Sequence, residues 1–137
     1  MDPLELLRQG LQGEAAVLFA LQFGSRTQHG QARIHSDWDV GVYLSDELTR
    51  KERFDLCRVL AARFEPAIRL DLVVLNDAPP LLAQRALLGQ RLFVRDRKAY
   101  VSFVVRTLAA AGDEAYWRRL HAEARQRRLE EGVFGRP

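Results

Sequence analysis

The sequence predicts an α/β or α+β domain, in which helices flank a small mixed sheet of three or four strands. Short apolar runs that end near glycine, asparagine or proline alternate with longer segments whose apolar residues recur at helical spacing. The chain has 137 residues and is 47% apolar, which is enough for one hydrophobic core. We therefore expect a single domain, with a helical extension towards the C-terminus.

The N-terminal part of the chain is expected to hold a helix, two strands and a connecting helix. Asp2 before Pro3 is a typical helix start. The apolar run "AAVLFALQF" stops at Gly24, as a strand covered on both sides does. The segment "WDVGVYL" alternates and predicts a second strand, and "SDELTRKERFDLCRVLAARF" begins with capping residues and continues as a helical stripe.

The rest of the chain is expected to complete the sheet and then turn helical. "AIRLDLVVL" predicts a third strand, "PLLAQRALLG" a helix, and "RLFV" a short edge strand. A long helix follows from Lys98, with an expected break at Gly112-Asp113, a C-cap glycine followed by a good N-cap. We assign residues 1–97 to the core and residues 98–137 to a helical extension packed on the same domain.

The charge pattern argues against a nucleic-acid surface. The net charge is only +3, and the chain has no long run of like charges. In "AYWRRLHAEARQRRLEE" glutamates interleave the arginines, which favours a solvated helix face or a docking surface for a partner protein. Tyr116, Trp117 and Leu120 are candidates for the apolar side of that surface. We expect no direct nucleic-acid binding.

The single cysteine and the short apolar runs argue against a secreted or membrane protein. Cys57 alone allows no disulfide or zinc framework. It lies at helical spacing with Phe54, Leu60 and Phe64, which predicts a small core residue. The run "AAVLFAL" is too short to span a bilayer, and no cationic segment with a cleavage site precedes it. We expect a cytoplasmic protein without membrane contact.

Two carboxylates, Asp37 and Asp39, stand at the start of the second predicted strand. Because strand side chains alternate, both project to the same side. Ionised carboxylates this close repel each other unless they are solvated, share a proton or hold a cation. Mg²⁺ suits such a pair, since it binds one or two carboxylates together with substrate phosphates. The alternative is that Asp37 belongs to a turn and Asp39 is solvated at a strand end.

A third carboxylate, Asp71, interrupts the apolar run of the third strand. An unpaired charge buried there would cost several kcal/mol, roughly, so Asp71 needs a partner. Arg69, on the same strand face, could supply an ion pair. Alternatively the third strand lies beside the second, and Asp71 joins Asp37 and Asp39. Three acids that hold two Mg²⁺ ions meet the needs of nucleotidyl transfer, because the ions activate a hydroxyl and neutralise charge at phosphorus.

Gly24 and Ser25 end the first strand just before the acidic pair. Glycine lets the backbone approach a ligand closely, while the following amides and the serine hydroxyl can bind an anion. An ordinary turn is the alternative. The position next to the acids favours a phosphate cradle.

Gly24-Ser25, Asp37-x-Asp39 and a following strand with Asp71 together resemble the nucleotidyltransferase superfamily related to DNA polymerase beta. More narrowly, the chain resembles the minimal nucleotidyltransferase (MNT) family, whose members are antitoxins paired with HEPN-domain toxins. The likeness covers "FGSRTQHGQARIHSDWDVGVYL" and "RLDLVVLNDAPPLLAQRALLGQRLFVRDRKAYVSF". Eleven residues separate Ser25 from Asp37, one more than is usual in that family.

The resemblance implies a nucleotidyltransferase-like fold and a role for each motif. Asp37 and Asp39 would bind two Mg²⁺ ions, and Asp71 would complete the shell of one ion beside the attacking hydroxyl. Gly24 and Ser25 would hold the terminal phosphates of the nucleotide. Arg26 is a candidate phosphate contact, with a solvated turn residue as the alternative.

The resemblance also implies a reaction. The protein would transfer AMP from ATP to a tyrosine hydroxyl of a HEPN ribonuclease toxin, silence it, and form a hetero-oligomer with it. Two alternatives stay open from the sequence. The protein could neutralise the toxin by binding alone, or it could transfer a nucleotide to a small-molecule hydroxyl, such as that of an aminoglycoside.

Overall fold

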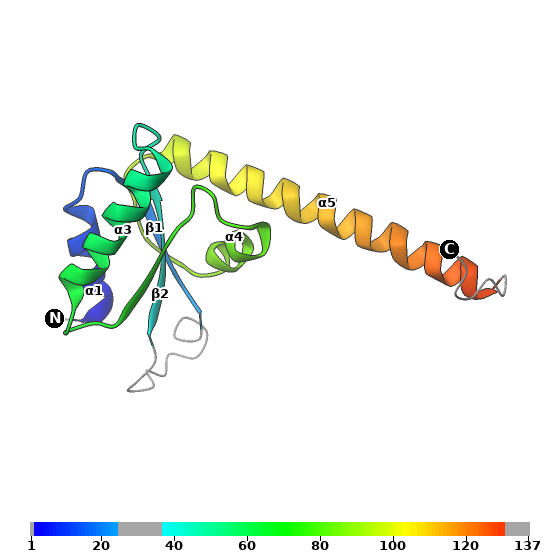
Figure 1. Ribbon diagram of the computed structural model, residues 1–137, viewed down its shortest axis with the longest axis horizontal. Coiled ribbons are helices and arrows are strands. Elements are labelled where there is room, and N and C mark those ends of the chain that lie inside the picture. The colour runs from blue at the N-terminus through cyan, green and yellow to red at the C-terminus, as the bar shows by residue number, and fades with distance from the viewer. Residues whose placement is uncertain (1, 25–36, 131–137) are drawn as a thin grey trace.

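A computed structural model describes residues 2–24 and 37–130 of the chain. In this part, four strands form one mixed sheet in the order β3-β2-β1-β4 (Figure 1). The strands are β1 (Val17–Phe23), β2 (Trp38–Leu44), β3 (Leu70–Val74) and β4 (Gln90–Val94). β1 runs antiparallel to β2 and β4, whereas β2 and β3 are parallel. The predicted fold class is confirmed.

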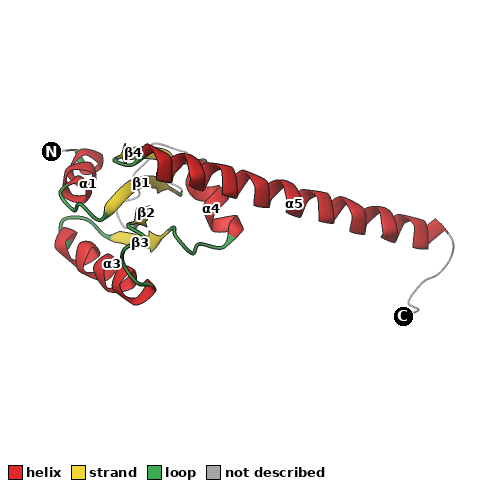
Figure 2. Ribbon diagram, turned by 90° about the horizontal axis from the view of Figure 1, so that it is seen from above, coloured by secondary structure: helices red, strands yellow, loops and turns green. Residues whose placement is uncertain are grey.

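Helices cover both faces of the sheet, as Figure 2 shows from above. They are α1 (Pro3–Gln12), α3 (Arg50–Phe64), α4 (Pro80–Leu87) and α5 (Arg97–Glu130). α1 and α3 share one buried cluster with the sheet, and α4 and the first part of α5 share another. The result is a three-layer arrangement with the sheet in the middle.

The predicted helix starts are confirmed by their capping bonds. The Asp2 side chain accepts a hydrogen bond from the Leu4 amide at 3.3 Å, with proline at the first position of α1. At α3, the Glu52 amide donates to Thr49 Oγ1 at 3.1 Å, and the Thr49 amide donates to Glu52 Oε1 at 2.9 Å. This reciprocal pair is a capping box, which satisfies two amides that the helix cannot bond.

In β2 and β3 the side chains alternate between the two clusters. In β2, Val40 and Val42 pack towards α1 and α3, whereas Tyr43 packs towards α4 and α5. In β3, Leu72 lies on the first side and Val73 on the second. The period of two therefore assigns every residue of β2 and β3 to one face.

α5 is continuous from Arg97 to Glu130, so the expected break at Gly112-Asp113 is wrong. A glycine that ends a helix commonly takes a left-handed backbone, and Gly112 does not, since among the described residues only Gly24 has a positive φ. Within a helix, glycine costs only about 1 kcal/mol relative to alanine, which one position can bear. The first part of α5 packs against the core through Phe103 and Thr107, and most side chains beyond them are exposed.

In residues 2–24 and 37–130, no helix is long and apolar enough to cross a membrane. The proposed division at residue 97 stays a prediction.

Cys57 lies in the core, as predicted, but its expected neighbour Phe54 does not. Cys57, Leu60 and Phe64 are buried, whereas Phe54 is 64% exposed at the outer side of α3. The Cys57 thiol donates a hydrogen bond to the Leu72 carbonyl at 3.3 Å. Burial, and after it the charge of Asp71, raises the pKa of the Cys57 thiol to about 11.

Cys57 is therefore expected to resist alkylation in the folded protein. At pH 8 a thiol with this pKa is about one part in a thousand thiolate, and only the thiolate reacts. Iodoacetamide labelling followed by mass spectrometry should give a slow rate in native conditions and a rate at least about a hundredfold faster in denaturant. Equal rates in the two conditions would contradict the burial.

Candidate active site

Asp39 and Asp71 lie opposite each other on the parallel strands β2 and β3. The register pairs Asp39 with Asp71, between the pairs Trp38–Leu70 and Val40–Leu72. Both residues share the parity of Val73, so both side chains project to the face covered by α4. Neighbouring strands are only about 4.8 Å apart, so the two aspartates lie side by side on this face of the sheet.

Gly24 brings the end of β1 against the same carboxylate. The register pairs Phe23 with Asp39, and Gly24 follows with a φ of 91°. A Cβ atom at Gly24 would lie 2.3 Å from Asp39 Oδ2, so this carboxylate or the turn would have to move to admit a side chain. This close approach and the positive φ together favour glycine at this position. Ser25 and Arg26, the other two predicted phosphate contacts, lie outside the described residues.

Asp37 precedes β2 and is exposed. Its Oδ1 lies 4.0 Å from Nε of Arg69, in an ion pair whose side chains are both more than half exposed. The alternative in which Arg69 pairs with Asp71 is therefore wrong within the described residues. Such an exposed pair contributes little stability, so a ligand can replace Arg69 at Asp37 at little cost.

The side chain of Asp71 is exposed, so the cost of an unpaired buried charge does not arise there. β3 is the edge strand of the sheet, which leaves Asp71 open to solvent. Its proximity to Asp39 follows from the strand register and not from a need for charge compensation.

The electrostatics of the site centre on Asp39. Burial raises the pKa of this carboxyl above its ordinary value, and the charges of Asp71 and Asp37 raise it further. The guanidinium of Arg85 lowers the Asp39 pKa and opposes them. A carboxylate whose ionised form is disfavoured by burial and by neighbouring acids is a setting in which a bound cation is favourable.

The donor chemistry of these acids fits a hard cation such as Mg²⁺. The candidate ligands are carboxylate oxygens, and Mg²⁺ takes one or two of them beside substrate phosphates and water. Among the described residues, no group of three or more histidine, cysteine, aspartate or glutamate side chains is already gathered for a metal. The pair Asp39 and Asp71 is therefore the part of the predicted ligand set that the fold itself brings together.

Arg85 is a site residue that the sequence did not reveal. It is exposed in the last turn of α4, beside the fully buried Ala86. α4 packs on the end of β1 through Ala83 and Ala86, which share a buried cluster with Phe23. From this helix the charge of Arg85 acts on Asp39. In the sequence, an arginine on a helix is indistinguishable from a solvated surface residue.

The comparisons with known proteins assign the family. The family described as "Polymerase beta, Nucleotidyltransferase" matches residues 5–98. The chain belongs to this family. The matched segment contains all four strands and the three acids, so the predicted class of enzyme, a nucleotidyltransferase, is confirmed.

Solved structures of toxin–antitoxin complexes resemble this nucleotidyltransferase over most of its length. One, a toxin–antitoxin with AMP-PNP, matches with a TM-score of 0.60 and 25% identity, and covers 96% of this chain and 99% of its own. The MntA-HepT toxin–antitoxin matches with a TM-score of 0.53 and 23% identity, and covers 94% and 98%.

A third similar structure is a tri-AMPylated HEPN toxin of Shewanella oneidensis in complex with its MNT antitoxin. It matches with a TM-score of 0.53 and 24% identity, and covers 95% of this chain and 98% of its own. A search of curated proteins gave no significant match. The predicted resemblance to the MNT antitoxins is confirmed.

Proposed function

We propose that this protein is an antitoxin that transfers AMP from ATP to a tyrosine hydroxyl of a partner HEPN toxin. The observation that carries the proposal is that Asp39, Asp71 and Gly24 meet at one end of the neighbouring strands β1, β2 and β3. The similar solved complexes support it, because one contains AMP-PNP and another an AMPylated toxin. The partners are ATP and the toxin, which implies a hetero-oligomer.

In this reaction the tyrosine oxygen attacks the α-phosphorus of ATP, and the bond from that phosphorus to the bridging oxygen breaks. Pyrophosphate leaves and the AMP group stays on the toxin. Asp37, Asp39 and Asp71 would hold two Mg²⁺ ions, which, when bound, favour loss of the hydroxyl proton and neutralise charge at phosphorus.

The remaining parts of the site bind and admit the substrates. The backbone at Gly24 is free to approach the terminal phosphates, since no side chain stands between it and Asp39. Arg85 adds a positive charge beside them. Asp71 lies exposed on an edge strand, where a tyrosine on the surface of a large protein can reach it. This exposure favours a protein acceptor over a small molecule enclosed by two walls.

The proposal is tested by incubating the protein with the toxin, Mg²⁺ and ATP labelled at the α-phosphate. We expect label on the toxin, none without Mg²⁺, and none on a toxin whose acceptor tyrosine is changed to phenylalanine. ATP labelled at the γ-phosphate should leave the toxin unlabelled, because pyrophosphate departs. Label from the γ-phosphate on the toxin would identify a kinase and overturn the assignment.

Arg85→Ala is expected to raise the KM for ATP about tenfold, with a smaller change in kcat, because loss of one phosphate contact weakens binding by about 1–2 kcal/mol. Arg85→Lys should retain part of the affinity, since lysine keeps the charge but not the planar fork. The matched control is Arg58→Ala, an exposed arginine on α3. An Arg85→Ala enzyme with an unchanged KM would remove Arg85 from the site.

The exposed aromatics of α5 favour a second candidate function, which is neutralisation by binding. Tyr116 is 54% exposed and Trp117 is 59% exposed, in ring contact with each other. A partner seated on them would need no catalysis. If Asp37→Asn protects cells from the toxin as fully as the unchanged protein does, masking is the better account.

A further inference from the structure

A cavity of about 280 Å³ opens at the outer edge of the sheet, along β3. Its walls are the α3 residues Arg50, Arg53, Phe54 and Cys57, the β3 residues 72–74, and residues 77–79 with Leu82 at the start of α4. Because α3 and α4 cover opposite faces of the sheet, a cavity lined by both lies at the edge of the strand between them. Figure 2 shows β3 outermost in the sheet, with these two helices on either side.

Backbone amides and carbonyls of β3 point outward along this edge. The ladder to β2 uses odd-numbered residues, since the Arg69 carbonyl accepts from the Trp38 amide and the Leu75 amide donates to the Val42 carbonyl. With a period of two, Leu72 and Val74 direct their amides and carbonyls away from β2. The Leu72 carbonyl accepts from Cys57 Sγ, a weak donor. The amides of Leu72 and Val74 are thus arranged to pair with another strand.

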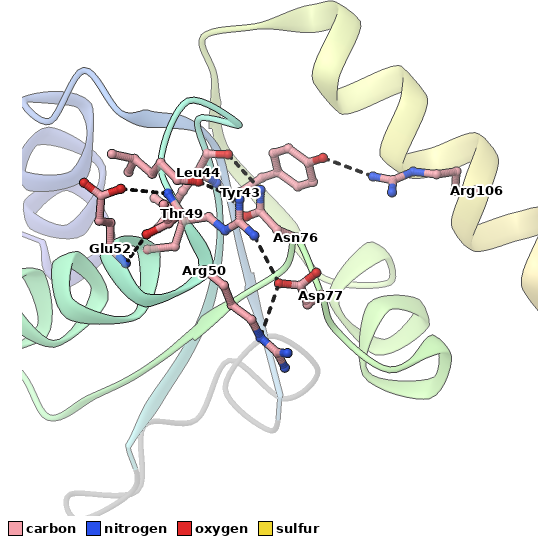
Figure 3. A network of polar contacts seen from close by, with 10 residues as sticks. Tyr43, Leu44, Thr49, Arg50, Glu52, Asn76, Asp77 and Arg106 are labelled. Carbon is pink, nitrogen blue, oxygen red and sulfur yellow. Dashed lines mark hydrogen bonds and ion pairs between the residues drawn. The ribbon is translucent and has the colours of Figure 1, made fainter.

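The cavity combines an apolar wall with a positive rim. Phe54 is 64% exposed, although its ring is large and apolar. Arg50 Nε and Arg53 Nη2 lie 3.8 Å and 3.2 Å from the same oxygen of Asp77, so two guanidinium groups share one carboxylate. Figure 3 shows Arg50 reaching towards Asp77. The Arg50 side chain is 86% exposed, so it can bind a second carboxylate.

We propose that the edge of β3 binds an extended segment of a partner protein as an added strand. One apolar side chain of that segment enters the cavity against Phe54, and a nearby aspartate or glutamate pairs with Arg50. The volume suits one or two side chains and falls at the lower limit of small-molecule sites. Charge argues against a second copy of this chain, because the cavity carries two arginines and only one acid. Main-chain bonds supply affinity in such complexes, and the side-chain pocket supplies selectivity.

The proposal predicts binding of a blocked hexapeptide, acetyl-Thr-Val-Leu-Glu-Val-Thr-amide, to the full chain. In amide NMR spectra, millimolar peptide should shift the Leu72 and Val74 resonances and slow their hydrogen exchange, and leave Val40 in the middle of the sheet unchanged. Replacement of the glutamate by glutamine should weaken binding about twofold to fivefold, the scale of an exposed ion pair. Methylation of alternate peptide amides should abolish binding, because the ladder then cannot form.

Matched variants separate the edge from the rest of the surface. Phe54→Ser should weaken peptide binding at least about fivefold, because the apolar wall is lost. Val59→Ser is the control, since Val59 is 49% exposed on the same helix and does not line the cavity. Shifts confined to side chains around Phe54, with unchanged β3 amides, would show a small-molecule-like site and overturn strand addition. The absence of any shift would also overturn strand addition, and so would equal weakening of peptide binding in the Phe54→Ser and Val59→Ser variants. These outcomes concern peptide binding at the β3 edge, whereas AMP transfer is measured separately by label on the toxin, so the failure of one proposal is distinguishable from the failure of the other.

Discussion

Asp39→Asn is expected to reduce AMP transfer about a thousandfold, the scale on which loss of one group that stabilises transition-state charge acts. Asparagine has the same shape, but it offers a neutral oxygen in place of the carboxylate that faces both Asp71 and Gly24. Initial rates of label transfer at saturating ATP measure the effect. Asp55→Asn, an exposed carboxylate on α3, is the matched control and should leave the rate unchanged.

The same substitution is expected to stabilise the metal-free protein. Burial and the neighbouring acids raise the Asp39 pKa in the folded state, so ionised Asp39 opposes folding at neutral pH. The sign follows from proton binding. The folded state binds this proton more tightly than the unfolded state does, so the contribution is most favourable below the unfolded pKa. It is lost as the pH rises through the raised folded pKa.

Denaturant unfolding without metal should therefore show Asp39→Asn to be more stable than the unchanged protein at pH 7. The difference should shrink as the pH falls through the raised pKa of Asp39, where this carboxyl takes up its proton. Activity lost together with stability gained is the signature of a group kept for chemistry. A variant that loses both would indicate that Asp39 supports the fold, and a variant that keeps its transfer rate would refute the assigned site.

The sequence predicted the elements well because their signals are local. The capping pattern at Thr49 and the alternation of β2 report directly on the backbone of their own segments. It failed where the outcome depends on packing between segments. Phe54 lies in apolar surroundings in the sequence, yet the outer side of α3 is uncovered.

The same distinction applies to the site. The motif placed Asp39 and Asp71 in one family pattern, and the parallel register of β2 and β3 accounts for their meeting. Arg85 could not be found in this way, because its place depends on how α4 packs against β1. The continuity of α5 at Gly112 is a similar case, since no contact within 4 Å of that position forces the helix to end.

Gly24→Ala is expected to reduce AMP transfer about a hundredfold while the protein still folds. The new Cβ would lie 2.3 Å from Asp39 Oδ2, so the carboxylate or the turn must move by about 1 Å, a displacement that can cost about 10²-fold in rate. In addition, an alanine at a φ of 91° costs about 1–2 kcal/mol of backbone strain.

Urea unfolding should show Gly24→Ala to be less stable by about that backbone strain, and label transfer measures the rate. Gly112→Ala is the matched control, because a Cβ there meets nothing within 4 Å and the residue lies inside α5. It should keep full activity and gain up to about 1 kcal/mol of stability, from the better helix propensity of alanine. Full activity in Gly24→Ala would show that Asp39 tolerates displacement, and the close approach of the β1 turn would then have no part in catalysis.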